Sequence, residues 1–356
     1  MKRGVLWILV SVTLLASFTI LAYWDFTVYM SSPISKEKPA KIKVVIPEGS
    51  TLTQVANLLR DREVVRSPTY FRIYLLVNEK ADRLRAGVYH FFTDQTPIQI
   101  ADELVSGPRT PYVVLTIREG YNVWQIAQTF EEAGLADAKK VLALLKDPAM
   151  AEKARVPRSP KGEYVVSSLE GFIFPETYYV EPGQSLERII LRMVEQYNKE
   201  LRKAKKDHLE EYSRLLEKVG LSDHDIVTLA SLVERETALP HEKKLVASVF
   251  LNRIRKQMRL QTDPTLTYSE ERRGAAPTKE DRENGSNPYN TYAHDGFPPG
   301  PICNPGRESL AAAVAPSQSG FLFFVAKRDG TGGHHFTTNY DDHRRAVKKY
   351  LKSAKK

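Results

Sequence analysis

Cysteine is almost missing from this sequence, because Cys303 is the only one among 356 residues. A single cysteine excludes an internal disulfide and any metal site built from several thiolates. No HExxH pattern or similar close spacing of histidine and acidic residues occurs either. We therefore expect no metal site, and the lack of disulfides still leaves an oxidising compartment open.

A concentrated patch of one charge is also missing. The sequence has 52 lysines and arginines against 43 acidic residues, a net charge of +9, and the basic residues are dispersed. Such a surplus suits nucleic acid, an anionic membrane surface or an acidic wall polymer, and selects none of them. The composition, 42% hydrophobic and 27% charged, is that of a globular protein with room for about two or three small domains.

The first long feature that the sequence does contain is an apolar N-terminal run. After Lys2 and Arg3 no charge occurs from Val5 to Trp24, which is about the length of a bilayer-spanning helix. Aromatic residues lie near both ends, at headgroup level. A cleaved signal peptide is the alternative, but its apolar core is normally shorter and followed by a small-x-small site, and none is clear here. We predict that residues 1–24 are a single-pass anchor in the cytoplasmic (inner) membrane.

This anchor sets the expected orientation. The basic pair before the run favours a cytoplasmic N-terminus and places the rest of the chain on the periplasmic or extracytoplasmic side. Nucleic acid is therefore disfavoured as a partner. The polar segment 25–41, with Pro33 and Pro39, is expected to be a stalk.

A faint internal repeat follows in the region 42–138, with an offset of 71 residues between its copies. Each copy predicts a short strand, a Glu-Gly turn and a helix with apolar residues at helical spacing. The pattern resembles the start of LysM modules, which bind wall glycans that contain N-acetylglucosamine; a plain α+β scaffold is the alternative. The recurring residues are Ile46, Glu48, Gly49, Leu52, Val55, Ala56 and Leu59, and then Ile117, Glu119, Gly120, Val123, Ile126, Ala127 and Phe130.

The region 139–356 changes to long amphipathic helices, followed beyond Leu260 by proline-rich loops with several aromatic residues. Long irregular segments within a folded domain are usually functional or disordered. We interpret these loops as the walls of a sugar-binding cleft. A helix predicted from Asp223 to Thr237 precedes them, and it carries Glu234 and Glu236 near its end.

The two glutamates point about 160° apart around the helix axis, so only one of them can face a given cleft. Glu236 continues the spacing of the apolar stripe of the helix, whereas Glu234 lies off it. Apolar surroundings favour the neutral carboxyl, which can then donate a proton near neutral pH. The geometry favours Glu236 as a general acid; the alternative is that both are surface acids paired with Arg235 or Lys243.

The segment 230–238, Ala-Ser-Leu-Val-Glu-Arg-Glu-Thr-Ala, resembles the signature of the YceG-like family of endolytic murein transglycosylases. The resemblance covers nearly the whole chain. It implies that the second glutamate of the motif, Glu236 here, is catalytic. It also implies an α+β fold: a transmembrane helix, a LysM-like α+β module and a mixed α/β catalytic domain with the acid on a helix. Other matching segments are 170–178, 246–253, 258–265, 289–292, 296–302 and 335–339.

The resemblance implies a reaction for which one glutamate suffices. Glycoside hydrolases typically need two carboxylates. In a lytic transglycosylase, Glu236 protonates the oxygen leaving between N-acetylmuramic acid and N-acetylglucosamine, and then accepts the proton of the muramyl C6 hydroxyl as that oxygen attacks C1. The product is a 1,6-anhydromuramyl end. The attacking group is already part of the substrate, which lowers the entropic cost, and no cofactor is required.

Smaller roles are expected for five polar residues that could orient sugar hydroxyl and acetamido groups: Gln261, Asp263, Tyr289, Asn290 and Asn339. Asp263 precedes a proline, so a turn cap is its alternative role.

Two alternative functions stay open, a noncatalytic wall-binding scaffold and a hydrolytic muramidase with Asp263 as its second carboxylate. The expected partners are glycan strands and the membrane; peptidoglycan synthases and division or elongation proteins are further candidates. The anchor suggests that nascent strands are cut near the membrane.

Overall fold

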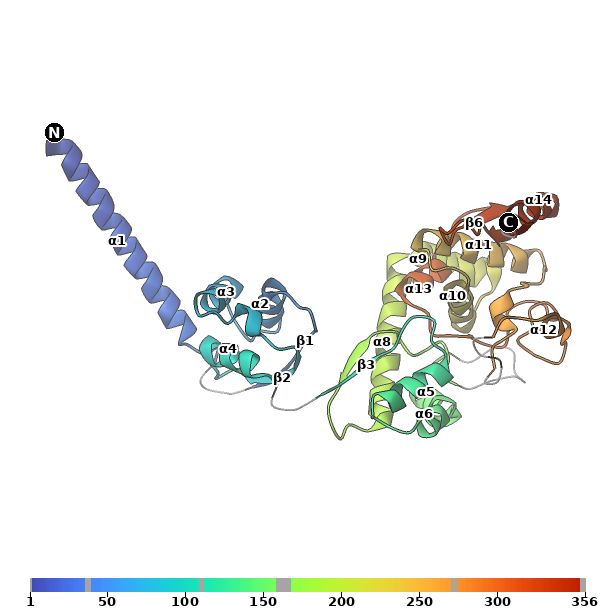
Figure 1. The fold of residues 1–356 in the computed structure, drawn as a ribbon, viewed down its shortest axis with the longest axis horizontal. Helices are drawn as coiled ribbons and strands as arrows, with labels where there is room; N and C mark the ends of the chain where they lie inside the picture. Colours follow the sequence, from blue (N-terminus) through green and yellow to red (C-terminus); the bar gives the residue numbers. More distant parts are fainter. Residues whose placement is uncertain are drawn as a thin grey trace. The chain divides into compact units, whose positions relative to one another are not determined.

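The computed structural model describes residues 2–35, 40–108, 112–157, 168–269, 272 and 275–352. Helices predominate, and the strands of the described residues form three two-stranded sheets, as expected for a mixed helix-and-strand fold (Figure 1). The chain divides into two compact units. Unit 1 comprises Met1–Val113 with Tyr179–Gly183, and unit 2 comprises Val114–Tyr178 with Gln184–Lys356.

Helix α1 (Lys2–Met30) is the predicted apolar N-terminal helix. Its segment Ser11–Met30 is long and apolar enough to cross a membrane, and residues 11–25 of this segment are all exposed. Because leucine, isoleucine and phenylalanine side chains cover the helix on all sides, it lacks the one polar face of an amphipathic surface helix.

The helix extends past residue 24, so the segment expected to be a stalk begins inside α1. Its last turns belong to the core of unit 1, where Met30 is only 2% exposed. The rings of Phe26 and Tyr29 pack edge-on against Tyr70, with centroids 5.5 and 5.3 Å away. Residues 36–39 of the expected stalk lie outside the described residues.

Unit 1 contains the first copy of the repeat. Strand β1 (Lys41–Ile46) pairs antiparallel with β2 (Gly87–Phe92), in a register that opposes Ile46 and Gly87. Helix α2 (Leu52–Asp61) follows the predicted Glu-Gly turn and begins with a capping box at Thr51. The remaining elements are α3 (Pro68–Val77), η1 (Ala81–Arg83) and α4 (Pro97–Ser106).

The second copy also forms a strand, a turn and a helix, namely β3 (Val113–Thr116) and α5 (Val123–Glu132). Gly49 and Gly120 occupy equivalent turn positions and both have left-handed backbones, with φ of 74° and 77°. Most of the second copy belongs to unit 2, so the boundary between the units lies within the region 42–138 and not at its end.

Unit 2 is built around helix α10 (Asp223–Glu236), which contacts α11 (Pro240–Arg255) and α13 (Arg307–Val314). Ser222 caps α10, and Asp225 accepts a hydrogen bond from the Ser222 backbone N–H at 2.9 Å. Nine residues of α10 are buried, on nearly all its faces, so the helix is a core element and its end is held in place.

The other elements of unit 2 surround this core. The helical stretch that begins at Leu186 is broken: α8 ends at Asp207 and α9 begins at Leu209. The strands β5 and β6 form an antiparallel hairpin. The elements are α6 (Ala138–Leu145), α7 (Pro148–Lys153), α8 (Leu186–Asp207), α9 (Leu209–Arg214), η3 (Leu215–Val219), η4 (Asp263–Thr265), α12 (Lys279–Glu283), β5 (Phe323–Ala326), β6 (His334–Thr337) and α14 (Tyr340–Lys352). Strand β4 (Thr177–Val180) begins in unit 2, and its last two residues belong to unit 1.

Candidate active site

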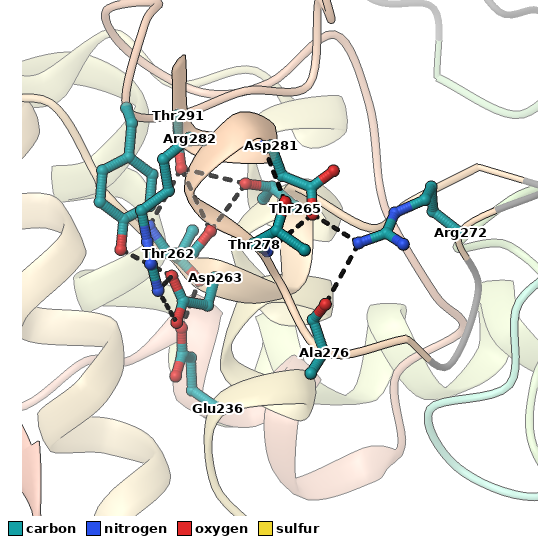
Figure 2. Close-up of polar contacts among 11 residues, drawn as sticks. Glu236, Thr262, Asp263, Thr265, Arg272, Ala276, Thr278, Asp281, Arg282 and Thr291 are labelled. Carbon is teal, nitrogen blue, oxygen red and sulfur yellow. Dashed lines mark hydrogen bonds and ion pairs between the residues drawn. The ribbon is translucent and has the colours of Figure 1, made fainter. Parts of the chain in front are cut away.

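Glu236 is the last residue of α10, and its side chain is partly buried. The Thr262 hydroxyl donates a hydrogen bond to its carboxyl oxygen Oε1 (Figure 2). Burial raises the pKa of Glu236 above its ordinary value, and the negative charge of Asp263 adds to the rise. The Thr262 hydroxyl and the nearby His334 and Arg253 act in the opposite direction. The carboxyl therefore keeps a proton more readily than an exposed glutamate does.

Thr262 is held by two further threonines. Its backbone N–H donates to the Thr291 hydroxyl at 3.0 Å, and its carbonyl accepts from the Thr265 hydroxyl at 2.7 Å. The hydroxyls of Thr265 and Thr291 are 3.0 Å apart, and all three residues are buried. Figure 2 shows this cluster beside Glu236. The cluster fixes where the Thr262 hydroxyl lies, and so fixes the orientation of the carboxyl.

Arg253 of α11 anchors the chain that leads into this cluster. Its guanidinium donates to the carbonyl of Leu260 at 2.7 Å and to the carbonyl of Leu322 at 2.7 Å. It also lies over the Phe323 ring, 5.0 Å from the centroid. Arg253 thus ties the segment before Thr262 to the β5 hairpin and places a cation near Glu236.

A second buried contact lies behind the end of α10. The His334 ring nitrogen Nδ1 is 2.7 Å from the Glu242 carboxylate, which also accepts the His334 backbone N–H at 2.9 Å. Both side chains are buried. The pair fixes the start of β6 to α11, and it explains how His334 reaches the surroundings of Glu236.

Asp263 is the first residue of η4, and both of its carboxylate oxygens have partners. The Arg282 guanidinium donates to Oδ2 at 3.0 Å and to Oδ1 at 3.2 Å. The Tyr292 hydroxyl donates to Oδ1 at 2.7 Å. A carboxylate engaged by these donors is a poor base for activating water, although it still influences the charge of Glu236.

The other predicted site residues have different surroundings. Gln261 is exposed next to Thr262, with a left-handed backbone (φ 50°), and its N–H donates to the Thr291 carbonyl. Tyr289 is 8% exposed and packs against the Tyr268 ring, with centroids 4.6 Å apart. Gln261 is therefore open to a ligand, whereas Tyr289 supports the site from the core.

Asn290 and Asn339 both organise backbone. Asn290 is fully buried, and its amide nitrogen donates to three carbonyls at the C-terminal end of α12, the shortest contact being 2.8 Å to Asn284. Asn339 is exposed and precedes α14, where its side chain accepts the Asp342 N–H at 2.9 Å. The structure thus brings Glu236, Gln261 and Asp263 together around Thr262, places Tyr289 and Asn290 in supporting positions, and uses Asn339 to cap a helix.

Glu234 has a set of partners that differs from that of Glu236. Its carboxylate lies 3.2 Å from the Lys243 ammonium group and accepts hydrogen bonds from the Gly306 N–H at 3.0 Å and the Ser309 hydroxyl at 2.6 Å. The Glu234 and Lys243 side chains are only 8% and 4% exposed. The alternative that pairs both glutamates with Arg235 or Lys243 thus applies only to Glu234, which pairs with Lys243 and is buried, while Glu236 faces a neutral hydroxyl.

Sequence reasoning missed Thr262, although its segment was among those that resemble the family. Threonine before a short 3₁₀ turn is ordinary in loops, so its residue type gave no signal. Within the described residues, no group of three or more histidine, cysteine, aspartate or glutamate side chains could hold a metal ion. What the site offers is one protonatable carboxyl at the end of a buried helix.

Comparisons with known proteins agree with each other. The sequence profile of the YceG-like family matches residues 44–349. A Bacillus subtilis (strain 168) protein named endolytic murein transglycosylase is 32% identical over 328 residues, which is 90% of this chain and 88% of that protein. A protein of the same name from Streptococcus pneumoniae serotype 2 (strain D39) is 30% identical over 95% of this chain and 64% of its own length.

A solved structure is also similar. The crystal structure of a YceG-like protein from Listeria monocytogenes has 32% sequence identity and a TM-score of 0.56. The match covers 86% of this chain and 99% of that one. The similarity therefore extends through most of both chains.

Proposed function

The chain belongs to the YceG-like family, and we propose that it is an endolytic murein transglycosylase whose catalytic acid and base is Glu236. The observation that carries this proposal is the protonatable carboxyl of Glu236 at the end of α10, with the buried Thr262 as its hydrogen-bond donor. An acid held by a neutral donor can give up and recover a proton without breaking an ion pair.

The proposed reaction balances without water. Protonated Glu236 donates its proton to the oxygen between N-acetylmuramic acid and N-acetylglucosamine, and the bond from C1 to that oxygen breaks. The muramyl C6 oxygen then bonds to C1 and loses its proton to the Glu236 carboxylate, which restores the acid. The products are a 1,6-anhydromuramyl end and a strand that begins with a free N-acetylglucosamine C4 hydroxyl. Cleavage inside strands near the membrane would limit the length of nascent glycan.

The remaining parts of the chain receive supporting roles in this proposal. Helix α1 anchors the enzyme in the cytoplasmic membrane with its N-terminus in the cytoplasm and unit 2 outside. The two strand–turn–helix copies, residues 41–61 and 113–132, act as LysM-like glycan contacts. Their support is the shared order of elements and the shared left-handed turn glycine.

The competing hydrolase needs a second carboxylate. Asp263 is the candidate, but Arg282 and Tyr292 engage both of its oxygens. A hydrolase would therefore have to break these contacts before Asp263 could act on water. The lytic reaction requires no such rearrangement, and we favour it for this reason.

Digestion of uncrosslinked glycan strands, followed by mass spectrometry, tests the proposal. The full chain in detergent should produce anhydromuramyl ends from internal cuts, and Glu236→Gln should reduce the rate by about 10²–10⁴-fold. Glu283→Gln makes the same change on an exposed carboxylate of α12 and should leave the rate unchanged. Reducing ends would instead identify a hydrolase, and binding without cleavage by the unmodified chain would identify a scaffold.

A further inference from the structure

A cavity of about 250 Å³ lies beside the candidate active site within unit 2. One lining residue, Arg235, directly precedes Glu236 in α10. Another, Pro264, directly follows Asp263 in η4. Ligand pockets for drug-sized molecules are about 300–1,000 Å³, so this cavity suits a substituent of a sugar better than a disaccharide. The other lining residues are Gly120, Asn122, Gln125, Gln128, Thr267, Tyr268 and Ile302.

Two of the lining residues, Asn122 and Gln125, have carboxamide side chains whose oxygens are engaged within the protein. In the capping box of α5, the Asn122 side-chain oxygen accepts the Gln125 N–H at 3.0 Å, and the Gln125 side-chain oxygen accepts the Asn122 N–H at 3.1 Å. Because each oxygen must face an N–H, the assignment of oxygen and nitrogen in both side chains is fixed. The two NH₂ groups make no hydrogen bond within the described residues, so they are available as donors.

Arg235 supplies a third donor group with a positive charge. It is exposed, and among the described residues it has no ion pair or hydrogen bond, unlike Lys243 and Arg282, whose carboxylate partners are close. Its guanidinium lies over Gly120: Nη1 is 3.7 Å from the position that a Cβ atom of this residue would occupy. The side chain thus lines the cavity without a carboxylate partner among the residues that the structure describes.

We propose that this cavity binds a carboxylate carried by a muramyl residue and so positions the strand for cleavage at Glu236; the inference rests on the proposed function. A guanidinium with two amide NH₂ groups forms a set of donors that matches a carboxylate, which only accepts. The N-acetylglucosamine units of the strand carry no carboxylate. Muramyl units carry one either on the free lactyl group or on the attached stem peptide, and both sources present the same chemistry to the cavity.

The cavity therefore distinguishes the two alternating sugars, and Arg235 acts as a positioning residue. Its removal should weaken strand binding without removing the proton donor. Gln125→Glu provides a second, independent variant, because glutamate at this position preserves the capping box while replacing the donor with a negative charge. It should weaken binding even if Arg235→Gln has indirect effects.

Binding is measured with the full-length Glu236→Gln chain in detergent, so that strands are not cut during the assay. Three fluorescent strands are compared: strands with stem peptides, amidase-treated strands with free lactyl carboxylates, and treated strands whose lactyl carboxylates are converted to neutral methylamides. We expect Arg235→Gln and Gln125→Glu to raise Kd about tenfold for strands that carry the bound carboxylate, and to leave Kd unchanged for neutral strands. Arg188→Gln, an exposed arginine of α8, is the matched control.

The pattern across strands identifies the source. Loss confined to peptide-bearing strands assigns the stem peptide, loss confined to amidase-treated strands assigns the lactyl carboxylate, and loss on both shows that the cavity accepts either carboxylate. Equal changes on all three strands, or no change on any, would overturn the proposal. Cleavage products are scored separately with the unmodified chain, so a failure of the lytic reaction and a failure of this cavity give different results.

Discussion

Replacing Thr262 with valine should move the alkaline limb of the pH–rate profile to higher pH. The Thr262 hydroxyl donates to the Glu236 carboxyl and so favours its charged form, against the effect of burial. Valine has a similar shape but no donor. The variant therefore leaves a buried carboxyl with less stabilisation of its charge, and the pKa of Glu236 rises further above its ordinary value.

The expected size follows from the contact that is lost. A hydrogen bond to a charged group contributes about 1.5–3 kcal/mol, and about 1.4 kcal/mol corresponds to one pKa unit. Glu236 keeps partial contact with solvent, so water replaces part of the lost bond and the lower end of the range applies. We expect the limb to move upward by about one pH unit, with the maximal rate falling by about tenfold or less because the carboxyl is less well oriented.

The assay is kcat/KM for release of anhydromuramyl ends across pH, since this parameter reports the ionisation of the free enzyme. A general acid is active while protonated, so activity falls as pH rises through its pKa, and a raised pKa extends activity to higher pH. Thr228→Val is the control, because Thr228 is equally buried in α10 but donates to the His224 carbonyl. A limb that stays in place, or moves to lower pH, would refute the assignment of Thr262 and Glu236 to one proton-donating unit.

Two further predictions concern buried charge. Lys243→Met leaves the Glu234 carboxylate without its cation in the core of unit 2 and should lower the free energy of unfolding by about 3–5 kcal/mol, whereas Lys244→Met at an exposed position changes little; urea denaturation measures both. Burial raises the pKa of Glu170 from 4.5 to about 7, so the folded chain binds this proton more tightly than the unfolded chain, and stability falls as pH rises through that range. Glu170→Gln lacks this titration and should flatten the stability profile between those two pH values; an unchanged slope would contradict the shift.

The sequence predicted the helix that carries the acid because all the signals for that helix are local. Ser222 and Asp225 form a capping box, and the apolar stripe runs toward Glu236. The same stripe separated Glu236 from Glu234, whose pairing with Lys243 is a contact between α10 and the next helix. Local spacing thus favours Glu236 over Glu234 as the acid, and the catalytic role of Glu236 stays a prediction.

The partners of the acid were not predictable in the same way. Thr262 reaches Glu236 from a loop 26 residues later, and its position depends on Thr265 and Thr291 as well. Asn290 has the residue type of a sugar-binding residue, but the last carbonyls of helix α12 lack partners within the helix, and Asn290 donates to them. Residue type alone does not distinguish these two uses of an amide.

The end of the N-terminal helix shows the same limit. The segment after residue 24 is polar enough to suggest a stalk, yet Phe26, Tyr29 and Met30 pack into unit 1. These three residues share one face of α1 because they are separated by three and four positions. This pattern is too short to predict packing from the sequence alone. The surface that the three residues pack against belongs to α3, which includes Tyr70.

The oxygen atom of the newly formed muramyl end tests the central claim most directly. Strands are digested by the full chain in water enriched in ¹⁸O, and the new ends are analysed by mass spectrometry. Intramolecular attack by the C6 hydroxyl predicts anhydromuramyl ends that contain no ¹⁸O. Reducing ends that carry one ¹⁸O atom would show that water attacks C1, and would contradict a mechanism in which Glu236 alone serves as acid and base.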